Sequence, residues 1–362
     1  MARAFLNGLL NLVAICFVVL AVIILMKVWG IGIPFLNVTQ SILANYTVST
    51  IPVSTLNGSQ DQGSAGNSTA QGNDLYQYAL SLINKDRNSF GLPNVSLASE
   101  VSGQQHSDSM LQNNYFSHWD TYGMKPYMRY TLVGGTQAVS ENVAYEQQSY
   151  QTCIVKCYDR GTLNPANAIY NMEYSMMYND SICCSNGHRE NILDPNHNQV
   201  SIGIAYNSST IYFTEDFIDS YINWSIGSPG ASNGTVLLKG SVADGYSLQS
   251  VQIGYDDAVR NMTMAELAAT RAYGYGDTVG GVSSSSFEYY PGLTTIVANR
   301  YSVKGGSFDI LFNMGELISK YGAGEYTVEV WLNKTGTGSG FIGSTYTVFV
   351  NSEGRQYVPQ NV

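Results

Sequence analysis

Charged residues are scarce in this chain of 362 residues. They make up 12% of the sequence, and 17 Lys and Arg stand against 27 Asp and Glu, so the net charge at pH 7 is −10. Proteins that bind nucleic acid need a basic patch for the phosphates, whereas the basic residues here are scattered. The composition therefore predicts no nucleic-acid partner. The 44% of hydrophobic residues is ample for a folded core, which excludes disorder for the bulk of the chain.

Histidine and cysteine are also few. All 4 histidines lie between residues 106 and 197, and no cysteine follows residue 184. The motif G-x-S-x-G, which marks a nucleophilic serine in many hydrolases, does not occur near the histidines; its single match, at residues 230–234, lies in a Gly-rich stretch beyond the last of them. An enzyme with this sequence would therefore have to be a metal-water hydrolase, and neither a metal site nor a thiol site is expected beyond residue 225.

Residues 5–26 form the longest apolar run, an almost unbroken series of Leu, Ile, Val, Ala and Phe. As a helix with about 1.5 Å per residue, the run is about 30 Å long, which matches the core of a bilayer. No small-residue cleavage site follows it, so we expect a single transmembrane anchor over residues 1–30, with a cleaved signal peptide as the alternative. Arg3 and the terminal amine, against Lys27, slightly favour an N-terminus inside the cell and the remaining chain outside.

Acceptor sites for N-glycosylation also indicate an extracellular location. The pattern N-x-[ST] occurs at Asn37, Asn45, Asn57, Asn67, Asn94, Asn179, Asn207, Asn223, Asn233, Asn261 and Asn333. Residues 31–72, which hold the first of these sites, have no hydrophobic periodicity and are rich in Ser, Thr, Asn, Gly and Gln. We therefore expect a flexible stalk between the membrane anchor and the first domain.

Helical and strand patterns begin at residue 73. A first helix is expected from Asn73, a second over residues 96–114, and Pro165 begins a third. Between residues 200 and 217 the spacing changes to that of strands. Helices flanking a short sheet are thus predicted.

Several polar motifs lie within this region. They are FSH at residues 116–118, SENVA at 140–144 and GHRENIL at 187–193, followed by the strand sequence IGI at 202–204. In this order, the motifs resemble the CAP superfamily (cysteine-rich secretory proteins, antigen 5 and pathogenesis-related 1; the SCP domain), nearest its microbial secreted branch. The resemblance covers about residues 73–217. It implies a CAP domain over residues 73–225 with an α+β fold, a three-layer α-β-α sandwich.

The resemblance also implies a cleft. In the family, a histidine of the first motif and one of the third face each other across a cleft with the glutamate of the second, and the matching residues here are His118, His188 and Glu141. Two neutral imidazoles and a carboxylate suit Zn²⁺ or another divalent metal, and the same groups can act as acid and base. Neither role follows from the residues alone. The residues expected to support this cleft are Asn142, Ser175, Arg189 and Asn191.

A fourth cleft position in the family often holds a second glutamate, on the helix before the third motif. The matching position here falls nearest Ser175, and Glu173 lies two residues earlier on a different helical face. A mechanism with two carboxylates is therefore not expected. Of the two remaining histidines, His106 is expected to be packed or capping, and His197 to lie on the surface or in a turn.

Four of the 5 cysteines cluster between the second and third motifs, at Cys153, Cys157, Cys183 and Cys184. Two disulfides are expected, each joining one of the first two cysteines to one of the adjacent pair, which fits an oxidising compartment. A zinc site of four thiolates is the alternative. It fits less well because neighbouring side chains diverge, whereas a tetrahedral ion needs converging ligands.

From about residue 226 the sequence becomes strand-like. Alternating apolar residues, for instance over residues 248–255 and 325–332, are separated by Gly-rich turns, and one short helix is expected over residues 264–272. The pattern predicts an all-β sandwich, Ig-like in size, over residues 226–362. Because this domain has no His or Cys, we expect it to act as a spacer or to contact a ligand.

Together these features predict a membrane-anchored extracellular glycoprotein. The resemblance implies that the cleft binds a lipid, a sterol or a protein, so non-enzymatic binding is the first hypothesis. A metal-dependent, peptidase-like hydrolase acting on extracellular or cell-envelope substrates is the second. A structural or adhesive surface protein with an unused cleft is the third. The first needs a groove wide enough for its ligand, the second needs a metal-bound water, and the third needs neither.

Overall fold

The computed structural model describes residues 68–148, 162–181, 184–270, 272–286, 292–338 and 340–359. One compact unit spans residues 65–362. It has mixed α and β content with a β-rich C-terminal part, as predicted. No helix within the described ranges is long and apolar enough to cross a membrane. The predicted anchor over residues 1–30 and most of the predicted stalk over residues 31–72 lie outside the described residues.

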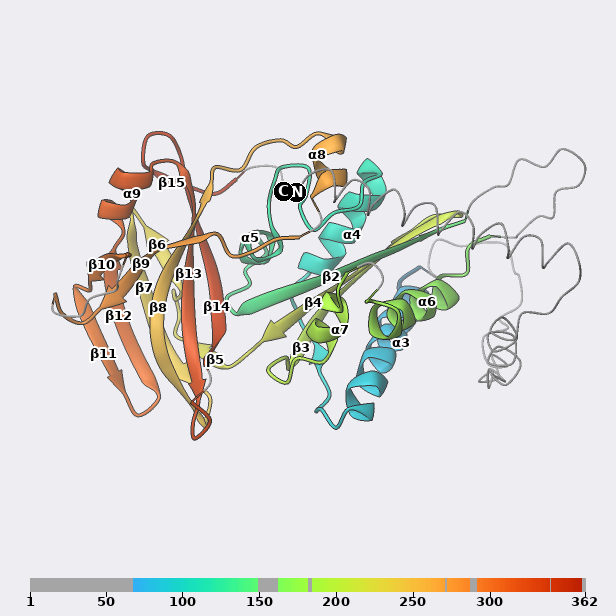
Figure 1. The fold of residues 1–362 in the computed structure, drawn as a ribbon, viewed down its shortest axis with the longest axis horizontal. Coiled ribbons are helices and arrows are strands. Elements are labelled where there is room, and N and C mark those ends of the chain that lie inside the picture. The colour runs from blue at the N-terminus through green and yellow to red at the C-terminus, as the bar shows by residue number, and fades with distance from the viewer. Residues whose placement is uncertain are drawn as a thin grey trace, which may run out of the picture. The chain divides into compact units, whose positions relative to one another are not determined.

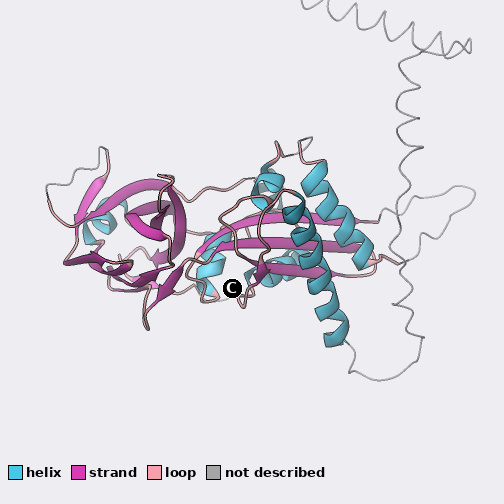
Figure 2. Cartoon of the chain, turned by 90° about the horizontal axis from the view of Figure 1, so that it is seen from below, coloured by secondary structure: helices cyan, strands magenta, loops and turns pink. Residues whose placement is uncertain are grey.

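The N-terminal part of this unit is a four-stranded sheet with helices on both faces (Figure 2). The strand order is β1-β3-β4-β2, so β2 lies at an edge of the sheet, where it pairs antiparallel with β4. The elements of this part are α3 Ser68–Ser89, β1 Ser96–Leu97, α4 Ser102–Asn113, α5 Pro126–Leu132, β2 Ala138–Gln147, α6 Pro165–Tyr178, α7 Gly187–Ile192, β3 Gln199–Tyr206 and β4 Thr210–Asp219.

Successive side chains of the strands alternate between the two helical layers. On β4, Phe213 packs into the apolar cluster that includes residues of α3 and α6, whereas Thr214 faces α4 and bonds to Ser107 at 2.8 Å. Helix α4 lies close to β3 because Gly203 has no side chain: a Cβ there would overlap the main chain of Gly103. This close approach fixes α4 against the sheet, and the residues that follow α4 in the chain include the first motif.

Two element boundaries differ from the prediction. Helix α3 begins at Ser68, ahead of the predicted Asn73. The helix predicted over residues 96–114 is divided, because Ser96–Leu97 pair in parallel with β3 and α4 begins only at Ser102. Pairing with β3 satisfies the main-chain hydrogen bonds of that short stretch in place of a helical turn.

The C-terminal part consists of two sheets around one core. Their strand orders are β10-β9-β8-β13-β14-β15 and β11-β12-β7-β5, with β6 also paired to β7. Leu238 of one sheet and Val328 of the other belong to the same buried cluster. The elements are β5 Ile222–Trp224, β6 Gly230–Ser232, β7 Thr235–Val242, β8 Tyr246–Asp257, α8 Met264–Ala269, β9 Asp277–Ser283, β10 Thr294–Val297, β11 Arg300–Lys304, β12 Ser307–Asn313, α9 Gly315–Tyr321, β13 Gly324–Lys334, β14 Gly340–Val350 and β15 Gln356–Tyr357.

The segment between β8 and β9, residues 258–276, leaves these sheets and packs against the N-terminal part, so that α8 lies beside α4 (Figure 1). Leu267 of α8 is buried in one apolar cluster with Met110 of α4. After α8, the carbonyl oxygen of Thr270 accepts a hydrogen bond of 3.1 Å from Ser117 Oγ. This β8–β9 connection therefore reaches the residues of the first motif.

Candidate functional site

A cavity of about 840 Å³ lies along β2. Its walls come from the residues after α4, from α7 and from the β8–β9 connection. Among the cleft residues implied by the motifs, those that line it are His118, Glu141, Asn142, His188 and Asn191. Ser175 and Arg189 are not among its lining residues.

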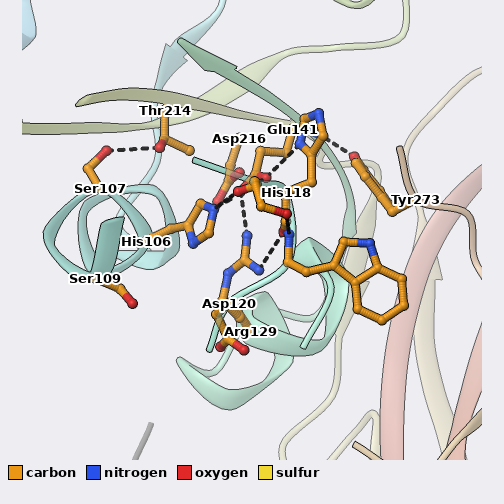
Figure 3. A network of polar contacts seen from close by, with 12 residues as sticks. His106, Ser107, Ser109, His118, Asp120, Arg129, Glu141, Thr214, Asp216 and Tyr273 are labelled. Atoms are coloured by element: carbon orange, nitrogen blue, oxygen red, sulfur yellow. Dashed lines mark hydrogen bonds and ion pairs between the residues drawn. The ribbon is translucent and has the colours of Figure 1, made fainter. Parts of the chain in front are cut away.

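His118 and Glu141 are hydrogen-bonded to each other (Figure 3). Nδ1 of His118 donates to Oε1 of Glu141 at 2.9 Å, and Oε2 of the same carboxylate accepts from Nη2 of Arg129 at 2.6 Å. Arg129 also donates to the carbonyl oxygens of His118 and Met124, each at 2.8 Å. It lies on α5, which begins with Pro126 at a position where the missing N–H costs no helical bond. Both oxygens of Glu141 are therefore engaged.

Burial has the largest effect on the pKa values of Glu141 and His118. It raises the pKa of Glu141 to about 7, although the Arg129 guanidinium acts in the opposite direction. Burial, together with Arg129, lowers the pKa of His118 to about 4, so this imidazole is neutral at pH 7. With the proton on Nδ1 toward Glu141, Nε2 of His118 carries a lone pair and makes no hydrogen bond to any residue that the structure describes.

His106 and Asp216 form a buried polar layer behind Glu141. His106 is 1% exposed and its Nε2–H donates to the carbonyl oxygen of Ser117 at 2.8 Å, so it is a packed histidine, as predicted. Burial raises the pKa of Asp216 well above its usual value, and the neighbouring Glu141 carboxylate adds to this rise. Asp216 is therefore the member of this acidic pair that keeps its proton.

His188 lies in the first turn of α7 and is oriented by Asp180. Its Nδ1 donates to Oδ1 of Asp180 at 2.6 Å, and its main-chain N–H donates to Oδ2 at 2.8 Å. Asn142 donates to the carbonyl oxygen of His188 at 3.2 Å, and Asn191 in turn donates to Asn142 at 3.0 Å. Within the described part of the chain, Nε2 of His188 has no hydrogen-bond partner, as for His118.

Three other residues singled out in the sequence lie outside the cavity. Arg189 supports α7, because its Nη1 donates to the carbonyl oxygen of Met177 at 2.6 Å. Ser175 is on the exposed face of α6, since the face toward the sheet presents Glu173. His197 closes a turn, as one of the two predicted alternatives had it, because its main-chain N–H donates to the carbonyl oxygen of Asp194. The other alternative, a surface position, was wrong: this side chain is 3% exposed, and both ring nitrogens lie within hydrogen-bond distance of polar side chains.

Glu173 lies behind the cavity, against Glu215 of β4. Burial raises the pKa of both groups; the neighbouring Glu215 raises the pKa of Glu173 further, whereas the hydrogen bond from Glu173 lowers the pKa of Glu215. Asn142 donates to Oε2 of Glu215 at 3.1 Å, and through its other contacts it links this pair to α7. The carboxylate that the sequence placed on a different helical face is therefore a core residue.

The described residues do not assemble a zinc site with three protein ligands. Glu141 is engaged by Arg129 and His118. One group of potential ligand atoms lies within 4.8 Å in the described ranges, and it consists of Asp180, Cys184 and His188. Cys184 is disulfide-bonded and offers no thiolate, while Asp180 already accepts from His188. What remains is Nε2 of two imidazoles, whereas catalytic zinc sites use three protein ligands.

The disulfide of Cys184 also bears on the four-thiolate zinc site considered above, because a bonded sulfur cannot ligate the ion as a thiolate. The other three candidates, Cys153, Cys157 and Cys183, lie outside the described residues. Their pairing therefore stays a prediction.

Three side chains of the site were missed by the sequence analysis: Arg129, Asp180 and Tyr273. The hydroxyl of Tyr273 accepts the main-chain N–H of Glu141 at 2.7 Å, and its ring centroid lies 5.1 Å from that of His118. No pattern in the sequence connects a tyrosine of the β8–β9 connection to the motifs. A signal for Asp180 did exist, because a carboxylate shortly before a motif histidine is a common orienting partner.

Comparison with known proteins supports the family assignment for part of the chain. Residues 80–217 match the family model of CAP, the cysteine-rich secretory protein family, which confirms the resemblance of the motifs. A solved structure of an extracellular protein containing a SCP domain from Bacillus anthracis str. Ames is 24% identical, with a TM-score of 0.29. The match covers 41% of this chain and spans 41% of that protein's length. No match was found among curated proteins.

Proposed function

We propose that this chain is a non-enzymatic binding protein displayed outside the cell, whose ligand lies in the cavity along β2. The observation that carries the proposal is the composition of the cavity. Apolar and aromatic side chains such as Phe116, Val143 and Met264 stand beside a few convergent polar groups. This mixture is typical of ligand-binding pockets, in which apolar walls supply affinity and polar groups fix orientation. The C-terminal β-sandwich, Ig-like in size, contributes one wall through the β8–β9 connection.

Binding accounts for the site better than hydrolysis does. Ser117 and Ser140 line the cavity, but their hydroxyls bond to Thr270 and Tyr275. Neither serine is thus paired with an imidazole that would act as its base. A metal-water mechanism lacks support for a different reason, because the described residues that line the cavity offer the ion only two imidazole nitrogens, those of His118 and His188. Both observations favour a site that holds a lipid, a sterol or a protein segment without cleaving it.

Zn²⁺ or another divalent metal remains part of the proposal in a limited role. His118 and His188 each donate Nδ1–H to a carboxylate, which orients the ring and increases the basicity of Nε2, as in many metal sites. These two imidazoles would hold the ion, while Glu141 would orient His118. When bound, the ion would add one positive charge centre for an anionic group of the ligand.

An extracellular, membrane-anchored location completes the proposal. The disulfide at Cys184 fits an oxidising compartment, and the N-x-[ST] sites fit a glycosylated surface. The apolar run at residues 5–26 would hold the chain in the cell membrane as a single span with its N-terminus inside.

The test uses two tryptophan variants of α8 in the full chain. Ala268 lines the cavity, so A268W fills it, whereas Ala269 is exposed on the same helix and does not line it, so A269W is the matched control. Binding of a dansyl-labelled fatty acid, a fluorescent sterol and a phage-displayed random peptide library is compared among wild type and both variants. We expect at least one probe to bind wild type and A269W and to be lost in A268W. Equal binding by all three proteins, or no binding of any probe, would contradict a cavity-based function.

A further inference from the structure

The cavity follows an edge of β2, and part of that edge has no hydrogen-bonding partner among the described residues. In the order β1-β3-β4-β2, strand β2 is last and is hydrogen-bonded to β4 on one side. The cavity is lined by Asn142, which contacts α7, and by Ser140 on the same face of the strand, and also by Glu141, Val143 and Tyr145 on the opposite face. A cavity in contact with both faces of one strand must lie along its edge. It is therefore the free edge of β2 that opens into the site.

Two tyrosines of the β8–β9 connection show which main-chain groups point outward. Tyr273 accepts the N–H of Glu141 at 2.7 Å, and Tyr275 donates to the carbonyl oxygen of Val139 at 2.9 Å. In an antiparallel strand the N–H and C=O of one residue point to the same side, and every second residue repeats the direction. The main-chain groups of Val143 therefore also point away from β4.

The same alternation applies to Tyr145, the next residue of this set. No described residue forms a hydrogen bond with the outward N–H and C=O of Val143 and Tyr145. The hydroxyls of Tyr273 and Tyr275 thus occupy one end of the edge, and the part beyond it is open. Two donors and two acceptors, spaced as in a β-ladder, face the cavity.

The two sides of the cavity differ in chemistry. On the side of α4 and α8, Phe116 and Met264 are 37% and 49% exposed, and the ring of Phe116 lies 4.7 Å from that of Tyr145. On the side of α7, the cavity is lined by Glu190 and Asp194. No Lys or Arg is among the described residues that line the cavity. One wall is thus apolar and the other acidic.

We propose that an extended peptide binds in this cavity as an additional strand along Val143 and Tyr145 of β2. The proposal rests on the function proposed above and names the ligand of the same site. Side chains of an added strand alternate between the two faces of the sheet. Apolar residues of the peptide would therefore contact Phe116 and Met264. The basic residues that alternate with them would face the acidic wall formed by Glu190 and Asp194.

A peptide fits this site better than a lipid or a sterol. A hydrocarbon chain laid against Val143 and Tyr145 would cover their N–H and C=O groups without offering them hydrogen bonds, and buried polar groups without partners are costly. A peptide main chain offers donors and acceptors at the same spacing. The acidic wall adds a preference for basic side chains, because the cavity presents carboxylates without a described guanidinium or ammonium group among its lining residues.

The first experiment measures binding of short synthetic peptides to the full chain by fluorescence anisotropy. The probe is a labelled, end-blocked peptide of alternating lysine and valine, and the charge control alternates glutamate and valine. Two further analogues carry N-methyl groups on the main chain. One is methylated at the main-chain nitrogen of every lysine, and the other at the main-chain nitrogen of every valine. An added strand turns one of these two sets toward β2 and the other toward solvent.

The expected result has three parts. The lysine peptide binds more tightly than the glutamate peptide. One N-methylated analogue loses affinity about tenfold or more, because it cannot donate to the strand edge, and the other binds nearly as well as the parent. Equal effects of both methylations, or no effect of either, would overturn the added strand. Failure of the lysine peptide to bind a protein that still binds another probe in the cavity would overturn the peptide ligand and leave the binding function in place.

A pair of variants at Tyr145 tests the same point on the protein. Y145P removes the outward N–H, which takes no part in pairing with β4, and proline is tolerated at such edge positions. Y145A removes the ring but keeps the N–H. We expect Y145P to lose more affinity for the lysine peptide than Y145A, with thermal unfolding used to show that both variants fold. Equal losses would mean that the ring of Tyr145 and not its main chain binds the peptide, and the proposal would be wrong.

Discussion

The guanidinium of Arg129 and the carboxylate of Glu141 form an ion pair of 2.6 Å in which both side chains are almost completely buried. This pair holds the wall of the cavity together, because Arg129 also donates to the carbonyl oxygen of His118. The histidine of the first motif and the glutamate of the second are thus fixed by a cation that neither motif contains. Their geometry depends on α5 as much as on their own strands and loops.

Replacing Arg129 with methionine should therefore destabilise the fold strongly. R129M leaves the Glu141 carboxylate buried without its partner, which costs about 3–5 kcal/mol in comparable cases. The free energy of unfolding is measured by urea denaturation, with R260M as the control for an exposed ion pair to Glu266, which we expect to change little. The double variant R129M/E141Q should recover part of the loss. A stability of R129M equal to that of wild type would show that the ion pair does not hold this wall.

Replacing Glu173 with glutamine should stabilise the protein at neutral pH. Folding raises the pKa of Glu173, so the folded state binds this proton more tightly than the unfolded state does. The associated stability is present below the unfolded pKa and is lost as the pH rises through the folded pKa. Glutamine keeps a donor toward Glu215 without a charge to bury. We expect E173Q to gain about 1 kcal/mol or more at pH 8 and much less at pH 4.

Urea denaturation at both pH values measures this difference. E316Q, at an exposed position of α9, is the matched control and should show no such dependence on pH. A gain for E173Q that is equal at pH 4 and pH 8 would contradict the explanation by a buried proton.

The sequence predicted the parts of the site that carry local patterns. The motif residues His118, Glu141 and His188 were identified from the sequence, and they line one cavity. Each belongs to a short local pattern at the end of a helix or on an edge strand, and proteins with such a fold share these patterns. Main-chain pairing of Ser96–Leu97 with β3 could not be predicted, since the partner is about a hundred residues away and the pattern of that stretch suits a helix. Tyr273 was missed for a similar reason. It reaches the site because the β8–β9 connection packs against the N-terminal part, and the residues next to it in the sequence give no sign of this contact.

The residues that hydrogen-bond to the motif side chains also determine which chemistry the motifs can perform. A glutamate and two histidines suggest metal ligands when they are considered alone. In the structure Arg129 and Asp180 take up hydrogen-bonding capacity of Glu141 and His188. Arg129 could not be assigned from spacing, because it lies on a separate helix, α5. Asp180 was the more accessible of the two, because it lies shortly before the motif histidine that it orients.

Zinc binding should be weak and should depend on both motif histidines. Nε2 of His118 and Nε2 of His188 are the two nitrogens left for the ion, and two ligands hold zinc less tightly than the three or four of established protein sites. Isothermal titration calorimetry of the full chain with ZnCl₂ is expected to show weak binding that is absent from H118A/H188A. E190Q, which changes an exposed carboxylate of the same cavity, is the control and should bind as wild type does. Tight binding that survives the double histidine variant would place the ion elsewhere.

Replacing Tyr273 with phenylalanine should destabilise the junction between the cavity and the C-terminal part. The variant keeps the ring beside His118 but removes the hydroxyl that accepts the N–H of Glu141 at 2.7 Å. A main-chain donor left without a partner costs about 1–3 kcal/mol when it is buried. Amide hydrogen exchange of Glu141 and urea denaturation should show faster exchange and a loss of that size. The control is Y122F, an exposed tyrosine near the first motif. If Y273F and Y122F are equally stable and Glu141 remains protected from exchange, then another group satisfies this N–H and the β8–β9 connection does not close this end of the strand edge.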